Sequence, residues 1–302
     1  MDAVTIIVAG GVNIDTTYHV ANLPREGETI FSTNTASSLG GKGLNQAVAA
    51  QRAGAHVAIL GTVGADQAGT DIRGFAKREG IETSLLRQAS GESTGSAIIA
   101  VDAAANNMII VDSGANKLTN FSVEDVPLSD LPNASYVVAN CEAPIAVITT
   151  LFEFAKRAGI STAWNPSPVP ADSAPLLLLT DVLVLNETEA TAIHSDGGPP
   201  EHLVQMIAKR GPREVVLTLG ASGALVYADG VLERVPAEAA RAVDPTAAGD
   251  TFLGYYIASR AKRQSPIDSA RNAGAAAALC VQRQGAVNAI PKAEELVGGA
   301  DV

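Results

Sequence analysis

Two aspartates, Asp244 and Asp250, bracket a run of small residues in the segment D-P-T-A-A-G-D-T-F over 244–252. Apolar side chains recur at helical spacing beyond it, so Gly249 and Asp250 are predicted to open a buried helix. Because the first amides of a helix lack intrahelical acceptors, the N–H groups of Ala248, Gly249 and Asp250 could hold an anion. Asp250 could then accept a proton from a hydroxyl group that attacks a bound phosphate. An acid favoured only by the helix dipole is an equally good interpretation of this aspartate.

A second set of polar residues follows the first apolar segment of the chain. The run 4–8 ends at Gly10 and Gly11, as expected of a buried parallel strand that meets a tight turn. Asn13 and Asp15 come next, and their spacing of two places both side chains on one face. That face lies just past the carboxyl end of the strand, where open α/β sheets bind ligands. A turn asparagine and an exposed aspartate are the alternative.

A glycine-rich segment, L-G-G-K-G-L-N-Q-A over 39–47, opens the next predicted helix. Gly41 and Gly43 leave the backbone open to a ligand at the helix start, and Asn45 lies one turn further on. Lys42 is followed by glycine rather than serine or threonine, so the segment is not a P-loop. A solvated lysine is the alternative for this position.

The remaining pattern predicts one α/β domain over 1–302 with inserted strands. The segments around 14–38 and 95–112 look like exposed alternating hairpins, which together could close over a site as a lid. From residue 136 onward strands and helices alternate, which indicates a mostly parallel sheet with helices on both faces. G-E-S-T-G over 91–95 matches a hydrolase nucleophile motif, but it precedes an alternating strand instead of a helix, which argues against a hydrolase.

Polar signatures follow the later predicted strands, where α/β sheets collect functional groups. They are 140–142, N-P-S-P at 165–168, N-E-T-E at 186–189 and T-L-G-A-S-G at 218–223. Glu189 could hold a magnesium-bound water near phosphates, although Asn186 and the acids also fit a simple helix cap. The amides of the last signature suit nucleotide phosphates, although a tight hairpin turn would look alike.

Composition excludes several classes of partner. The formal charge is −11 without any basic cluster, which makes nucleic acid and anionic membranes unlikely partners. The chain start lacks a signal-peptide pattern and no apolar run could span a bilayer, so a cytoplasmic protein is expected. Cys141 and Cys280 are then ordinary thiols, and the four histidines fit no metal-binding spacing.

Taken together, G-G-K-G-L-N-Q-A and A-V-D-P-T-A-A-G-D-T-F resemble the two signatures of the ribokinase/PfkB family of carbohydrate kinases. The resemblance runs along nearly the whole chain. It implies a ribokinase-like three-layer α/β sandwich with a mostly parallel central sheet, a small β-lid and a homodimer formed through that lid. It also implies transfer of the γ-phosphoryl group of ATP to a sugar hydroxymethyl group, the 5-hydroxyl of D-ribose above all.

The resemblance assigns roles to individual positions. The sugar positions are Asn13, Asp15, Gly41, Lys42, Asn45, Glu142 and Asp250, and Asp250 is also the general base, with Ala248 and Gly249 in the anion hole. The ATP and magnesium positions are Asn186, Glu189, Thr218, Gly220, Ser222 and Gly223, with Glu189 acting on Mg²⁺ through water. A potassium site matches Asp244, Thr246, Cys280, Arg283 and Gly285.

Three departures from the family pattern leave parts of this assignment open. Pro245 stands where the family usually has threonine, Gly274 where an adenine-flanking asparagine or histidine is frequent, and Ala289 where a serine often closes the potassium site. The alternatives are a kinase for deoxyribose, fructose, adenosine or another sugar or nucleoside, and a non-catalytic sugar-binding protein of the same fold. The scarcity of aromatic residues argues against a stacked nucleobase in the acceptor site.

Overall fold

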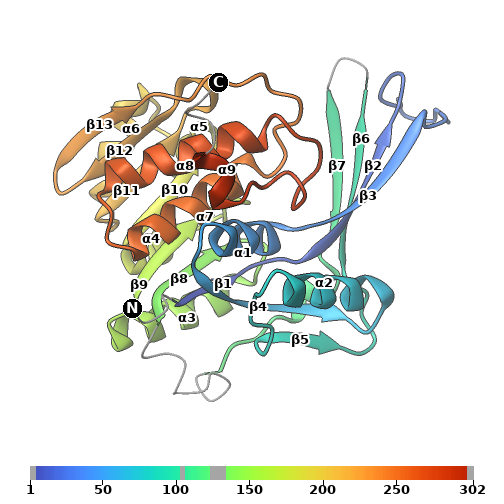
Figure 1. The fold of residues 1–302 in the computed structure, drawn as a ribbon, viewed down its shortest axis with the longest axis horizontal. Helices are drawn as coiled ribbons and strands as arrows, with labels where there is room; N and C mark the ends of the chain where they lie inside the picture. The colour runs from blue at the N-terminus through green and yellow to red at the C-terminus, as the bar shows by residue number, and fades with distance from the viewer. Residues whose placement is uncertain (1–4, 103–105, 123–133, 298–302) are drawn as a thin grey trace.

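The computed structural model describes residues 5–102, 106–122 and 134–297 (Figure 1). In this part of the chain the larger sheet has nine strands in the order β13-β12-β11-β10-β9-β8-β1-β4-β5. The strands from β11 to β5 are parallel, and β12 and β13 add an antiparallel edge. Their bounds are β1 Thr5–Ala9, β4 His56–Gly64, β5 Leu86–Ala89, β8 Ala134–Asn140, β9 Ser161–Asn165, β10 Val182–Asn186, β11 Glu214–Thr218, β12 Ala224–Ala228 and β13 Val231–Val235.

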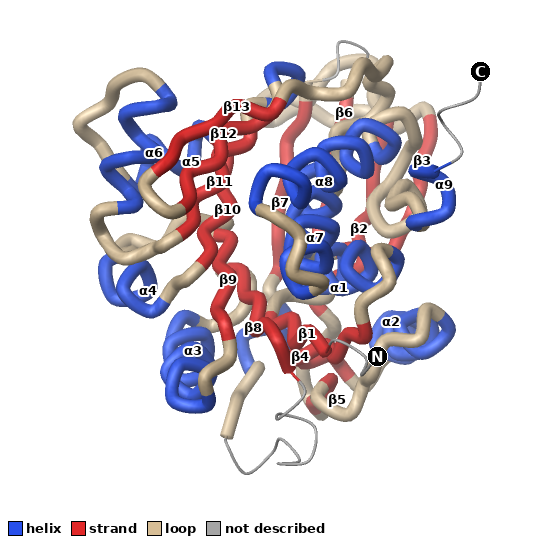
Figure 2. Tube along the Cα trace, turned by 60° about the vertical axis from the view of Figure 1, so that its left-hand side comes forward, coloured by secondary structure: helices blue, strands red, loops and turns tan. Residues whose placement is uncertain are grey.

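Helices cover both faces of this sheet (Figure 2). One layer holds α1 Lys42–Arg52, α2 Gln67–Arg78, α7 Ala248–Ala261 and α8 Pro266–Cys280, and α9 Ala293–Val297 packs beside it. The other layer holds α3 Ile145–Ala158, α4 Ala174–Leu179, α5 Glu187–Ile193 and α6 Pro200–Ala208. No helix in the described ranges has both the length and the apolar character needed to cross a bilayer.

Strand β1 shows why the sheet is buried on both sides. Ile6 and Val8 join the core beneath α1 and α7, whereas Ile7 and Ala9 join the core beneath α3 and α4. Every side chain of such a strand is removed from water, so its sequence reads as a continuous apolar run rather than an alternating one. The apolar run at the start of the sequence therefore predicted this strand well.

Helices α1 and α7 lie against each other above the middle of the sheet. Gly254 makes this approach possible, because a Cβ atom at this position would lie 2.4 Å from the Cβ atom of Ala49. The contact joins the helix that follows the glycine-rich segment to the helix that follows the D-P-T-A-A-G-D segment. Two sequence motifs about 200 residues apart are thereby brought together.

A second sheet rises from the edge of the main body (Figure 1). Its strands follow the order β3-β2-β6-β7, with bounds β2 Asn13–His19, β3 Asn34–Gly40, β6 Gly95–Val101 and β7 Asn107–Asp112. The two segments that the sequence indicated as hairpins thus pair with each other, because β2 runs parallel to β6 from Asn13 opposite Gly95. Strand β2 starts at the end of β1, so this sheet begins at the carboxyl edge of the main sheet.

The structure confirms the predicted α/β class with its mostly parallel sheet and two helical layers. It adds β5, β13 and α4, which the sequence patterns did not indicate. Strand β13 is V-L-E-R-V at the sheet edge with mostly exposed side chains, and β5 has only four residues. Short edge strands lack the apolar run and the alternation by which a strand is recognised.

Candidate active site

Close packing of glycines brings the start of α1 against the turn after β1. The Gly43 N–H group donates to the Gly11 carbonyl oxygen at 2.9 Å, and Gly41 has a φ of 87°, which favours glycine. A Cβ atom on Gly43 would lie 2.6 Å from the carbonyl carbon of Gly10. Only glycine therefore lets the first turn of α1 reach the carboxyl edge of the sheet.

Asp250 lies in the first turn of α7, where the sequence predicted a helix start, and its residue is 7% exposed. Its two carboxylate oxygens accept hydrogen bonds from α1: Asn45 Nδ2 donates to Oδ2 at 3.0 Å, and Gln46 Nε2 donates to Oδ1 at 2.9 Å. The residue before the helix, Ala247, has the left-handed φ of 61° that turns the chain into it. The carboxylate is thus held in place by two neutral amide donors, one at each oxygen.

The amides at the start of α7 are partly free to bind an anion. Among the described residues, the N–H groups of Gly249 and Asp250 have no acceptor, as expected of a helix N-terminus. The Ala248 N–H group differs from the sequence expectation, because it donates to the Pro245 carbonyl oxygen at 3.2 Å. Gly249 faces open space, since a Cβ atom built there meets no heavy atom within 4 Å.

Two further carboxyl groups, those of Asp15 and Glu142, lie near Asp250. Burial, and then the negative charge of Asp250, raises the pKa of Asp15 to about 6. Burial raises the pKa of Glu142 to about 7, although the Lys42 backbone N–H group donates to its Oε2 atom at 2.8 Å and opposes the shift. The charge of Asp250 is in turn the main cause that raises the pKa of Lys42. Three acids and one cation therefore share one buried region.

The asparagines at this edge complete the sugar-binding positions expected from the resemblance. Asn13 is buried, and its Oδ1 atom accepts a hydrogen bond from Asn116 Nδ2 at 2.7 Å. Asn45 points its Nδ2 group at Asp250, and its buried Oδ1 atom has no hydrogen-bond partner among the described residues. An unpaired buried acceptor is costly, so this oxygen suits a hydroxyl group of a ligand. The structure thus places all seven expected sugar positions near the carboxyl ends of the main-sheet strands.

Asn186 and Glu189 lie at the carboxyl end of β10. They form a capping box, in which Asn186 Oδ1 accepts from Glu189 N at 2.9 Å and Glu189 Oε2 accepts from Asn186 N at 3.0 Å. Thr218 pairs with Asn186 across the parallel strands and donates its hydroxyl to the Leu185 carbonyl oxygen at 3.3 Å. The helix-cap interpretation therefore holds, and the cap also leaves one Glu189 oxygen without a partner in the described chain.

The T-L-G-A-S-G turn follows β11 as one turn of 3₁₀-helix over Gly220–Ser222. The N–H groups of Ser222 and Gly223 donate within the turn, to Leu219 and Gly220 carbonyl oxygens at 3.0 Å each. Those of Gly220 and Ala221 have no acceptor in the part of the chain that the structure describes. Free amides are present as the sequence predicted, one on the named residue Gly220 and one on Ala221, whereas the amides of the named residues Ser222 and Gly223 are used within the turn.

Four of the five expected potassium positions meet beside the start of α7. The Asp244 carboxylate accepts from Thr246 N and from Gly285 N, each at 2.9 Å. Cys280 Sγ lies 3.7 Å from the Thr246 carbonyl oxygen. Asp244 therefore ties the loop before α7 to the loop after α8 through backbone N–H groups of both loops.

Arg283, the fifth expected position, and Ala289, one of the departures from the family pattern, contribute no side-chain oxygen. The Arg283 side chain forms an ion pair with Glu295, so only its backbone could serve a cation. Ala289 is fully buried against Ala247 and Cys280, where its methyl group takes the place of a hydroxyl oxygen. Gly274 lies on α8 and faces open space. This position therefore offers no side chain to flank the adenine ring that the resemblance places here.

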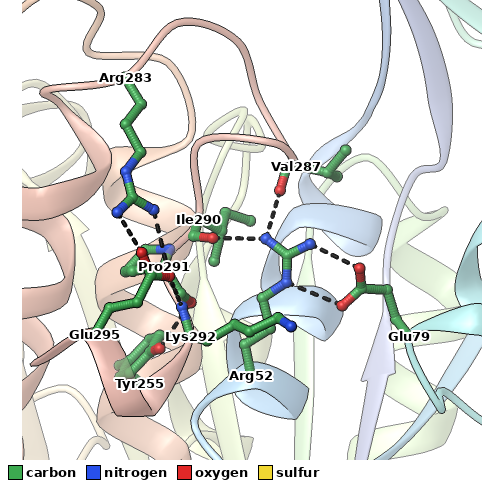
Figure 3. A network of polar contacts seen from close by, with 9 residues as sticks. All are labelled: Arg52, Glu79, Tyr255, Arg283, Val287, Ile290, Pro291, Lys292 and Glu295. Atoms are coloured by element: carbon green, nitrogen blue, oxygen red, sulfur yellow. Dashed lines mark hydrogen bonds and ion pairs between the residues drawn. The ribbon is translucent and has the colours of Figure 1, made fainter.

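Arg52, at the end of α1, holds the loop after α8 in place (Figure 3). Its guanidinium group donates to the carbonyl oxygens of Val287 at 2.9 Å and Ile290 at 2.6 Å. The other edge of the same group forms a bidentate pair with Glu79, at 2.9 Å and 2.7 Å. A fork of five donors suits this task, because it satisfies two carbonyl groups and one carboxylate at once.

Gln46, Asn116, Asn140 and Asn165 complete the site, although the sequence analysis gave them no role. Asn140 and Asn165 stand opposite each other at the ends of β8 and β9, and both contact the Gln46 amide. The strand-end signatures contained both residues, and Gln46 lies next to Asn45 in the glycine-rich segment. Asn116 lies in a short 3₁₀-helix far along the chain, and no sequence pattern indicated it.

A model of the pfkB family of carbohydrate kinases matches residues 4–293. The chain belongs to this family. The kinase is 32% identical over 295 residues to the ribokinase of Haemophilus influenzae, with 96% of each chain covered. It is 34% identical over 299 residues to the ribokinase of Staphylococcus aureus, covering 96% of this kinase and 98% of that relative. The structure of Arabidopsis thaliana ribokinase complexed with ribose and ATP has a TM-score of 0.87 at 28% identity over 98% of both chains. These matches confirm the resemblance drawn from the two signatures.

Proposed function

We propose that this kinase transfers the γ-phosphoryl group of ATP to the 5-hydroxyl group of D-ribose. The observation that carries the proposal is the buried Asp250 carboxylate, which two side-chain amides hold beside the open N-terminus of α7. Its relatives in Haemophilus influenzae and Staphylococcus aureus are ribokinases, and the related Arabidopsis structure is complexed with ribose and ATP. A carboxylate next to an anion-binding helix start is what phosphoryl transfer to a hydroxyl group requires.

In this proposal Asp250 accepts the proton of the attacking hydroxyl group. A positioned base contributes about 10²–10⁴-fold to the rate. The free N–H groups of Gly249 and Asp250 hold the transferred phosphoryl group, and one such donor contributes about 10²–10³-fold where water is excluded. The Ala248 amide joins them only if its turn hydrogen bond to Pro245 opens.

The sugar lies against the residues at the carboxyl edge of β1 and the start of α1. Carboxylate and amide oxygens accept hydrogen bonds from sugar hydroxyl groups, and the Lys42 ammonium group donates to a sugar oxygen. The residues are Asn13, Asp15, Gly41, Lys42, Asn45, Glu142 and Asp250. Hydroxyl donors would also relieve the desolvation that raises the pKa of Asp15 and of Glu142.

ATP occupies the edge formed by β10, β11 and the following turn, which leads to α7. The residues proposed to hold it are Asn186, Thr218, Gly220, Ser222 and Gly223, and the free Gly220 and Ala221 amides suit phosphate oxygens. Glu189, which has one oxygen without a partner in the described chain, would hold Mg²⁺ through a water molecule, and the ion would supply neutralisation of phosphate charge. The described ranges contain no cluster of three or more His, Cys, Asp or Glu side chains that could hold a metal ion.

Potassium is proposed to activate the kinase from the loop region around Asp244. The proposal is supported by the Asp244 carboxylate, which accepts backbone N–H groups from the loops before α7 and after α8 and so brings these loops together. The site comprises Asp244, Thr246, Cys280, Arg283 and Gly285. The Ala289 side chain supplies no oxygen, so the proposed ligands are backbone carbonyl groups of these loops together with Asp244.

The small sheet is proposed to act as a lid and as the surface of a homodimer, within one kinase domain of a cytoplasmic protein. Exposed apolar side chains on β6 and β7 support this, since Ile98, Ile109, Ile110 and Val111 are each about half exposed or more. Ile98 and Ile110 stand opposite each other on one face of this sheet, and exposed apolar side chains there favour association with a second copy. Sedimentation velocity should show a dimer that Ile110→Glu converts to a monomer; a monomeric wild type would contradict this part of the proposal.

The proposed reaction is tested with an ADP-release assay at saturating Mg-ATP and K⁺. Acceptors are ribose, deoxyribose, fructose and adenosine, and a reaction without acceptor is the control. We expect the highest kcat/KM with ribose, and mass spectrometry should locate the phosphate on the 5-position. A clear preference for another acceptor would replace ribose and keep the mechanism. Ribose binding without ADP release would instead support a non-catalytic sugar-binding protein.

A further inference from the structure

We propose that Gln46 is a positioning residue for the reaction, because it fixes the orientation of the Asp250 carboxylate through a directed chain of side-chain amides. The inference rests on the proposed function, in which Asp250 is the base. Gln46 itself is 1% exposed and lies one residue beyond Asn45 on α1. It acts through Asp250 rather than on the substrate.

The Gln46 side-chain amide joins α1 to three other parts of the site. Its Nε2 group donates to Asp250 Oδ1 at 2.9 Å and lies 3.3 Å from Asn165 Oδ1. Its Oε1 atom accepts from Asn140 Nδ2 at 3.0 Å. One buried amide thus connects the carboxyl ends of β8 and β9 with the first turn of α7.

The three amides of Asn140, Gln46 and Asn165 form a row, and a backbone group at each end of this row decides which way each amide points. The Glu142 N–H group donates to Asn140 Oδ1 at 3.1 Å, so Asn140 must present its NH₂ group to Gln46. Asn165 donates its Nδ2 group to the Val184 carbonyl oxygen at 3.1 Å, so its oxygen must face Gln46. Gln46 can satisfy both neighbours only with its oxygen toward Asn140 and its NH₂ group toward Asn165 and Asp250. A backbone N–H and a backbone carbonyl cannot exchange roles, so the orientation is fixed.

The consequence for Asp250 is electrostatic as well as geometric. An NH₂ group offers only donors, and a carboxyl group that receives donors at both oxygens is stabilised in its ionised form. The charge of Asp250 lies near those of Asp15 on β2 and Glu142 after β8, which repel it, and near that of Lys42 on α1, which attracts it. Gln46 adds a neutral donor to these surroundings, and it holds one carboxylate oxygen at a fixed place.

The first test replaces Gln46 by an apolar side chain of similar length. In Gln46→Met we expect kcat for the preferred sugar to fall about 10–100-fold, while the sugar KM changes less than about threefold, since the residue stabilises the base rather than the bound sugar. Gln51→Met is the matched control, because Gln51 lies on the same helix and bonds to the Val57 backbone instead. It should retain the wild-type kcat.

A double-mutant cycle separates this role from simple support of the fold. If Gln46 acts through Asp250, Gln46→Met should lower the residual kcat of Asp250→Asn by less than about twofold. The same loss in both backgrounds, a loss confined to KM, or an unchanged kcat would each overturn the inference. A wild-type chain that phosphorylates no sugar would overturn the proposed function itself, and the inference with it.

Gln46→Glu provides a second variant in case Gln46→Met does not fold. It keeps the shape of the side chain but replaces the NH₂ donor by an oxygen. Two adjacent carboxyl groups share a proton more readily as the pH falls, and the protonated one can donate to the other. We therefore expect the ratio of variant kcat to wild-type kcat to rise between about pH 8 and pH 6. A ratio that stays constant with pH would contradict the inference.

Discussion

Buried acids have different partners at the two ends of the parallel strands, which we call the carboxyl edge and the amino edge of the main sheet. At the carboxyl edge, Asp250, Asp15 and Glu142 lie together, and none of them forms an ion pair within the described chain. At the amino edge, the acids are paired with cations. Glu214 at the start of β11 contacts Arg260 Nη2 at 3.1 Å and accepts from the Tyr256 hydroxyl at 2.6 Å.

Asp181, which precedes β10 at the amino edge, is also paired with a cation. Lys156 Nζ lies 2.6 Å from its Oδ1 atom, and the Thr162 hydroxyl and N–H groups donate to its Oδ2 atom. Burial alone would raise the pKa of Asp181, but these partners outweigh burial and lower it. Burial instead prevails for Asp15 and Glu142, whose pKa values rise to about 6 and about 7.

The difference indicates where the carboxylate oxygens of this kinase can still accept hydrogen bonds from a ligand. A fully paired acid has its charge neutralised and its lone pairs satisfied, so it contributes to stability and has nothing to offer a ligand. Acids held only by amides and by one another retain acceptors for hydroxyl groups, at some expense of stability. The contrast can be tested by neutralising one acid at a time.

Asp250→Asn should have the largest effect. We expect kcat to fall about 10²–10⁴-fold, because the variant lacks the proton acceptor. The midpoint of thermal unfolding should change little, since relief of repulsion from Asp15 and Glu142 offsets the loss of an acceptor for Asn45 or Gln46. Stopped assays of ADP release and a thermal melt provide the two measurements. A variant with wild-type kcat would remove Asp250 from the mechanism.

Glu214→Gln should show the opposite pattern. The change leaves the Arg260 charge without its buried partner, and the free energy of unfolding should fall by about 2 kcal/mol, less than for a fully buried pair because Arg260 is partly exposed. At a temperature where the variant is folded, its kcat should equal that of the wild type. Urea denaturation measures the free energy of unfolding. A loss of kcat without a loss of stability would contradict the assignment of Glu214 to a purely structural ion pair.

Asp15→Asn should change the stability of the unliganded protein by no more than Glu214→Gln does, and the size of this change depends on pH. Because the pKa of Asp15 is raised to about 6 in the folded state from 3.8, the folded state binds more protons than the unfolded state between these values. Ionised Asp15 therefore costs stability above about pH 6, and this cost disappears as the pH falls toward 4. The variant should be more stable than the wild type by about 1–2 kcal/mol at pH 8, and equally stable near pH 4.

Urea denaturation of the unliganded protein at both pH values measures this difference. Asp71→Asn on α2 is the control, because Asp71 is exposed and lies outside the acid cluster. It should give the same difference from wild type at either pH. An Asp15→Asn variant that is destabilised at pH 8 would show that this acid is paired, contrary to the contrast between the edges.

The sequence by itself determined the fold class and which strand ends and helix starts form the candidate site. Apolar runs such as 4–8 predicted buried parallel strands because a strand covered on both faces needs no polar side chain. The helix start at Asp250 followed from local geometry, since free amides and small residues occur there whatever the helix packs against. The positions at strand ends were also predictable, because parallel strands end at a common edge.

Only the tertiary structure decided how these residues act on one another. Asn45 and Asp250 are 205 residues apart in the chain, and no local pattern states that one donates to the other. Glu189 and Asp250 are both acids in the first turn of a helix, yet Glu189 closes a capping box whereas Asp250 receives amides from α1. The orientation of the Gln46 side-chain amide is set, through Asn140 and Asn165, by the Glu142 N–H group and the Val184 carbonyl oxygen. Hydrogen-bond polarity, burial and the repulsion between carboxylates arise from contacts across the chain, and spacing along the sequence does not contain them.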